Sequence, residues 1–204
     1  YRRGMPTTHA RFGEATAILA GDGLLHQAYE TFIKIFDTEI STRTVKALKI
    51  FGDKTGINGM LGGQSADVLH TGEIISDELL YYIYEKKTGA LIEGAMLTGS
   101  VLAGCNDEDL AKIKRVGELV GLAFQIKDDI LDIYGNEKEI GKPLHSDEKN
   151  NKKTYITING IEKSEHDIVV MSEEACDIVS SLGNDVEERD FIIKLIKYLT
   201  DRTY

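Results

Sequence analysis

Residues 119–133, LVGLAFQIKDDILDI, have apolar side chains on nearly every side of a helix and yet include three aspartates. A helix of this kind belongs in the middle of a protein, because outer helices have one apolar stripe and a broad polar face. Burying an unpaired carboxylate costs free energy, so Asp128, Asp129 and Asp132 need partners. The run therefore predicts a core helix with a polar or ion-filled space beside it.

Helical periodicity extends over almost all of the remaining sequence, and only two prolines occur among the 204 residues. No alternating strand pattern and no hairpin signal is found. Ser76, Asn106, Ser164 and Asn184 stand where N-caps are expected, the last three with an acidic residue three positions later. We therefore predict one all-α domain over residues 1–204, with helices at 9–36, 42–54, 58–70, 77–103 and 107–134, two more that begin near Ser164 and Asn184, and a loop at 135–153.

The balance of 24 basic and 34 acidic residues gives a formal net charge of −10, which disfavours nucleic acid as a partner. Cys105 and Cys176 match no zinc spacing, so we expect a reducing, cytoplasmic location rather than disulfide bonds. Residues 89–104 are apolar but short and interrupted by Glu93, and we expect no membrane insertion. We expect no signal peptide. The chain starts without methionine in what reads as mid-domain sequence, so we also expect a fragment.

The aspartates follow one side of their helix. On a 3.6-residue period Gly121, Gln125, Asp128 and Asp132 share a narrow stripe, and Asp129 lies beside it. Carboxylates at this spacing can share Mg²⁺, which commonly links one or two carboxylates to substrate phosphates. The alternative is the solvated acidic edge of an ordinary helix. The apolar residues on both sides of the stripe weaken this alternative but do not remove it.

A magnesium–diphosphate site also needs cationic side chains on other segments. Lys87 lies within a second nearly all-apolar segment, residues 81–105, and Lys142 and Lys152 lie in the expected loop. Arg2 and Arg3 are adjacent at the start of the chain. Each is an ordinary surface residue when taken alone. Together with the aspartates, they supply what binding of a magnesium diphosphate requires.

Five segments, in order along most of the chain, resemble the trans-isoprenyl diphosphate synthases. They are RRGMPTTHARFGEATAILAGDGLL at residues 2–25, GGQSADV with Gln64 and Asp67, EKKTGALI with Lys87, Thr88 and Gly89, FQIKDDILD with the three aspartates, and the lysine-bearing GKPLHSDEKNNKKTY. The chain is most similar to the bacterial farnesyl diphosphate synthases, with the short-chain geranylgeranyl type nearby. The order and number of the matches make the resemblance specific.

The resemblance implies an all-α orthogonal bundle around a deep central cavity, magnesium as cofactor and a homodimer. It also implies prenyl transfer. An allylic diphosphate ionises, the carbocation alkylates the double bond of isopentenyl diphosphate, and a proton is lost. By position in the family's motif, Asp128 would be the main metal ligand, with Asp129 and Asp132 supporting it directly or through water. Thr88 and Gln125 would present oxygens to the carbocation.

The same resemblance assigns the cationic residues. The allylic diphosphate would be held by Arg2, Lys87 and Lys142, with Lys152 close to it. Arg3 would bind the diphosphate of isopentenyl diphosphate. Two further residues would line the cavity: Gln64 and Asp67.

The family's first aspartate-rich motif precedes the segment that begins at Arg2, and it is absent from this sequence. We therefore expect the 204-residue chain itself to lack prenyltransferase activity. Three other readings stay open. A terpene cyclase shares the implied fold but mixes Asn, Ser and Glu in its second metal site. A non-catalytic subunit of a heteromeric synthase tends to lose the aspartates and lysines, and a simple helical binder of Ca²⁺ or Mg²⁺ does not account for the lysines.

Overall fold

A computed structural model of the protein describes residues 1, 4–135, 152–183 and 186–202. Every regular element in these ranges is a helix, so the all-α prediction is confirmed. The helices are α1 Thr8–Phe12, α2 Glu14–Ile33, η1 Lys34–Asp37, α3 Thr42–Thr55, α4 Met60–Leu69, α5 Asp77–Ile83, η2 Tyr84–Gly89, α6 Ala90–Leu102, α7 Asp107–Tyr134, α10 Tyr155–Asn159, α11 Ile161–Ser180 and α12 Val186–Asp201.

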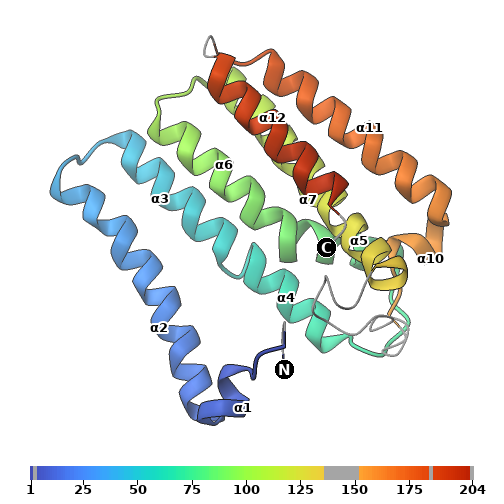
Figure 1. The fold of residues 1–204 in the computed structure, drawn as a ribbon. Helices are drawn as coiled ribbons and strands as arrows, with labels where there is room; N and C mark the ends of the chain where they lie inside the picture. The colour runs from blue at the N-terminus through green and yellow to red at the C-terminus, as the bar shows by residue number, and fades with distance from the viewer. Residues whose placement is uncertain (2–3, 136–151, 184–185, 203–204) are drawn as a thin grey trace.

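The helix α7 is the centre of the molecule. It packs against α6, η2, α11 and α12, and α3 covers the outer side of α6 (Figure 1). Its side chains enter both hydrophobic clusters, with Ala123, Ile126 and Ile130 in one and Val116 and Leu119 in the other. The predicted burial of residues 119–133 is therefore confirmed. By contrast, α2 lies at one edge and has no buried residue.

At two glycines the helix boundaries differ from those that the sequence periodicity predicts. The expected helix at residues 9–36 is broken at Gly13, where φ is +85°. The expected start at Ser164 is wrong, because α11 begins at Ile161 and the buried Ser164 hydroxyl donates to the Gly160 carbonyl inside the helix. Gly160 has φ of +77° and joins α11 to α10, a short helix that periodicity did not indicate. A positive φ is costly for residues other than glycine, so these breaks are set by the backbone. Asn184 lies outside the described residues.

A π-helical turn, η2, interrupts the expected helix at residues 77–103. Such turns carry one extra residue and are frequent at functional sites. Here the turn brings Gly89 against Gly121 of α7 with no side chain between the two backbones. A Cβ atom built on Gly121 would lie 2.5 Å from the Gly89 Cα. The contact fixes how η2 crosses α7.

Gly121→Ala is expected to destabilise the fold by about 1–3 kcal/mol, because the added methyl meets backbone that cannot move aside. Gly99→Ala is the matched control. Gly99 is an exposed position of α6 with no neighbour near its Cβ, and the same change there should stabilise the helix by about 0.5–1 kcal/mol. Urea unfolding of both variants measures the difference, and equal effects at the two positions would contradict the proposed contact.

Candidate active site

Two hydrogen bonds continue the crossing of η2 and α7 beyond the glycine contact. Thr88 Oγ1 donates to Gln125 Oε1 at 2.8 Å, and the Tyr84 hydroxyl donates to the buried carboxylate of Asp129. Asp129 also accepts from the backbone nitrogen of Tyr155 at 3.1 Å, where α10 begins. Residues 121, 125 and 129 are one helical stripe at a spacing of four. This stripe of α7 therefore faces η2, and Asp129 rather than Asp128 continues it.

Two lysines from distant segments meet at Asp67 on α4. Lys87 Nζ lies 2.7 Å from Asp67 Oδ2, and Lys152 Nζ lies 2.8 Å from Oδ1. The pairs are partly buried, with side-chain exposures of 33% for Lys87, 26% for Lys152 and 15% for Asp67. Burial raises the pKa of Asp67, but the hydrogen bonds from Lys152 and Lys87 outweigh it and leave that pKa below its ordinary value. An ammonium group has three N–H donors, so each lysine keeps two for a ligand.

Close packing places α4 beside η2. A Cβ atom on Gly63 would lie 2.2 Å from the backbone nitrogen of Lys87, so the two elements touch through backbone at this point. Gln64 is the next residue of α4, half-buried and three positions before Asp67. The structure thus brings together Lys87, Lys152 and Asp67 as one cluster. Thr88 links that cluster to Gln125.

The three aspartates do not converge in the same way. The side chain of Asp128 is 36% exposed and forms an ion pair with Arg202, the residue that follows α12. Asp129 and Asp132 are buried, at 4% and 1% exposure. Within the part of the chain that the structure describes, no three His, Cys, Asp or Glu residues are grouped so that they could hold a metal. Asp128 is the carboxylate that best fits a cation, because it is the accessible one of the three and its observed partner is the Arg202 guanidinium.

Arg202, the partner of Asp128, was not predicted from the sequence. It lies 74 positions from Asp128, and a single arginine after a helix carries no local motif. The signal was the need for a cationic partner at a half-buried carboxylate, which the sequence alone could not assign to one residue. Among the predicted site residues, Arg2, Arg3 and Lys142 lie outside the described residues.

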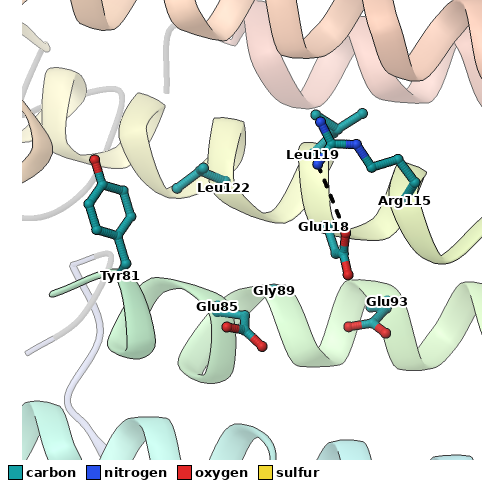
Figure 2. A pocket seen from close by; sticks show the side chains of 8 residues that line it. All are labelled: Tyr81, Glu85, Gly89, Glu93, Arg115, Glu118, Leu119 and Leu122. Carbon is teal, nitrogen blue, oxygen red and sulfur yellow. Dashed lines mark ion pairs between the residues drawn. The ribbon is translucent and has the colours of Figure 1, made fainter. Parts of the chain in front are cut away.

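A pocket of about 300 Å³ is lined by residues of α5, η2, α6 and α7 (Figure 2). Its charged residues are Glu85, Glu93, Glu118 and Arg115, and neither Lys87 nor Asp67 lines it. Glu93 is 3% exposed and forms an ion pair with Lys54 of α3 at 2.5 Å. An excess of carboxylates disfavours a diphosphate. We therefore place the candidate site at the lysine cluster and Asp128 rather than in this pocket.

Asp67→Asn should reduce the loss of stability in acid. Folding lowers the pKa of Asp67, so its carboxylate stabilises the folded state fully above the ordinary aspartate pKa. This stabilisation decreases as the pH falls through the pKa of Asp67 in the folded state. Over about pH 5 to about pH 3, wild-type protein should lose more free energy of unfolding than the variant does. Urea titrations at several pH values measure this slope. Asp53→Asn, at an exposed site on α3, is the control, and equal slopes for wild type and Asp67→Asn would contradict the assignment.

The chain is similar to known prenyl synthases over its whole length. It is 35% identical to the farnesyl diphosphate synthase of Bacillus subtilis, over 100% of this chain and 68% of that protein. It is 37% identical to the geranylgeranyl diphosphate synthase of Cyanophora paradoxa, over 95% of this chain and 66% of that protein. The chain thus spans about two-thirds of the length of these relatives.

Solved structures give the same result. A geranyltransferase from Helicobacter pylori, complexed with magnesium and isoprenyl diphosphate, matches with a TM-score of 0.79 and 29% identity over 96% of this chain and 63% of that one. A geranylgeranyl pyrophosphate synthetase from Pyrococcus horikoshii matches with a TM-score of 0.84 and 26% identity, over 99% of this chain and 72% of that one. The sequence model of the family described as polyprenyl synthetase matches residues 1–192, and the chain belongs to that family.

Proposed function

We propose that the protein containing this chain condenses isopentenyl diphosphate with an allylic diphosphate, dimethylallyl or geranyl, in a magnesium-dependent reaction that yields farnesyl diphosphate. The observation that carries the proposal is the meeting of Lys87 and Lys152 at Asp67, next to the Thr88–Gln125 hydrogen bond. Two cations from separate segments, each with donors to spare, form a site for a polyanion such as diphosphate. A geranylgeranyl product is the second candidate, because a relative at 37% identity is named for it.

The chain's own residues account for the main steps. Arg2, Lys87 and Lys142 would bind the allylic diphosphate, with Lys152 close to it, and would offset its charge as the carbon–oxygen bond breaks. Arg3 would bind the diphosphate of the second substrate. Thr88 and Gln125 present oxygen dipoles that stabilise the adjacent allylic cation. Apolar neighbours of α7 keep water from quenching that cation. The electrons of the isopentenyl double bond form the new carbon–carbon bond, and a proton leaves.

Asp128 would hold magnesium, with Asp132 and Asp129 in the supporting roles that the family's motif assigns them. Magnesium, when bound, supplies positive charge that stabilises the leaving diphosphate. Because both buried aspartates are oriented by the fold, their support of the metal would pass through water or through rearrangement of their present contacts. Gln64 and Asp67 would complete the cavity lining, Asp67 by holding the two lysines.

The remaining parts of the proposal concern the assembly and its location. The helices of the described residues include none that is long and apolar enough to cross a membrane. We propose a cytoplasmic homodimer. The exposed apolar side chains of α2, which include Ile18, Leu19 and Leu24, support a partner subunit on this edge of the molecule. The retained lysines and Asp128 argue against a non-catalytic subunit.

Lys87→Met should weaken the binding of geranyl diphosphate to the folded chain by about 10–100-fold, since one charge-assisted hydrogen bond contributes about 1.5–3 kcal/mol. Lys86→Met is the matched control, because the neighbouring lysine pairs with Glu85 instead of Asp67 and lies outside the cluster. Calorimetric titrations with and without Mg²⁺ measure both variants. A similar loss for the two lysines would show nonspecific charge attraction and remove support for this site.

Asp128→Ala should lower prenyl transfer by orders of magnitude in the whole protein that contains this chain, while helicity is retained. The rate is measured with radiolabelled isopentenyl diphosphate and geranyl diphosphate, and helicity by circular dichroism. Geranyl diphosphate supplied alone is the control for a cyclase, which needs no second substrate. A near-normal rate in the variant would make Asp128 a structural residue.

A further inference from the structure

We propose that Arg202 is a positioning residue for Asp128, which it holds in the orientation that binds the metal. The inference rests on the proposed function and adds to it a residue from the far end of the chain. Arg202 follows α12, whose C-terminal end lies beside α7 (Figure 1). The end of α12 thereby becomes part of the candidate metal site.

Three contacts hold the Arg202 guanidinium in place. Its Nη2 donates to Asp128 Oδ1 and, at 3.3 Å, to the carbonyl oxygen of Phe124. Its Cζ atom lies 3.8 Å from the centroid of the Phe124 ring, which is a cation–π contact. The Arg202 side chain is only 14% exposed. These contacts restrict the side chain and direct an N–H group at Asp128.

The contacts favour positioning over competition with a metal. Two of the three are made with Phe124, one turn before Asp128 on the same helix, and neither depends on the carboxylate. These two contacts would keep the guanidinium beside α7 when Asp128 binds a metal. Among the described residues, Arg202 bonds one carboxylate oxygen, Oδ1, and no hydrogen bond to Oδ2 is observed. The second oxygen of a 36% exposed side chain is left for a ligand.

The expected size of the effect follows from metal sites in general. Groups that hydrogen-bond a ligating carboxylate fix its rotamer, and their loss typically lowers metal affinity by about 10–100-fold. Lysine does not replace arginine here, because the planar guanidinium both stacks on a ring and donates from a fixed position. Arg202→Lys keeps the positive charge but loses the stacking on Phe124 and the fixed direction of the N–H donor.

The test is Mn²⁺ binding to the folded 204-residue chain, followed by electron paramagnetic resonance of the free ion. Arg202→Gln should raise the dissociation constant by about 10–100-fold, and Arg202→Lys should restore little of the loss. Lys194→Gln is the matched control, since it removes one positive charge from an exposed position of α12 and should leave Mn²⁺ binding unchanged. Phe124→Leu removes the stacking surface without touching Arg202 or Asp128 and should weaken binding in the same direction.

Circular dichroism and urea unfolding establish that each variant is folded before its affinity is compared. Unchanged or tighter Mn²⁺ binding by Arg202→Gln would overturn the inference, because it would show that the arginine is neutral or competes with the metal. Failure of the wild-type chain to bind Mn²⁺ would overturn it as well. Neither result decides the proposed function, which is tested separately by Lys87→Met and geranyl diphosphate.

Discussion

The contact between Gly89 and Gly121 determines how the polar groups of η2 and α7 meet in the site. With no side chain between them, the backbones of η2 and α7 meet, and the residues on either side come within hydrogen-bond reach. Thr88 then bonds Gln125, and Tyr84 bonds Asp129. On the α4 side of η2, Lys87 pairs with Asp67. Two close backbone approaches, of η2 to α7 and of η2 to α4, therefore position the polar groups and Lys87.

The fold was predictable where the determining forces are local. Helical period and apolar content are properties of short windows, so the all-α class and the burial of α7 followed from sequence. The π turn could not be predicted from the sequence, because the extra residue in the turn of η2 changes neither the composition nor the apolar content of the segment. Ser164 fits the N-cap pattern but lies inside α11, since the positive φ at Gly160 lets the helix start earlier. Capping patterns indicate a start only when no stronger signal lies just upstream.

The candidate site was predictable as a set of residues but not as a set of contacts. The resemblance identified Lys87, Lys152 and Asp67, yet their pairing spans up to 85 positions and depends on how α4 packs against η2. The aspartates show the limit most clearly. A one-residue step on a helix turns a side chain by about 100°. Asp128 therefore faces the end of α12, while its neighbour Asp129 joins η2 to the start of α10.

In the ligand-free site the charged side chains pair with one another, and this explains how a largely apolar bundle accommodates its charges. Asp67 offsets one of the two lysine charges that would bind diphosphate, which leaves the cluster one net positive charge, and Arg202 offsets the carboxylate that would bind magnesium. Each counter-charge uses only part of its partner's capacity, since a lysine keeps two donors and Asp128 keeps one oxygen. The internal partners therefore offset the cost of burial and fix the orientation of the binding groups. Lys87, Lys152 and Asp128 would then meet their ligands already oriented, and less free energy would be lost to ordering these side chains on binding.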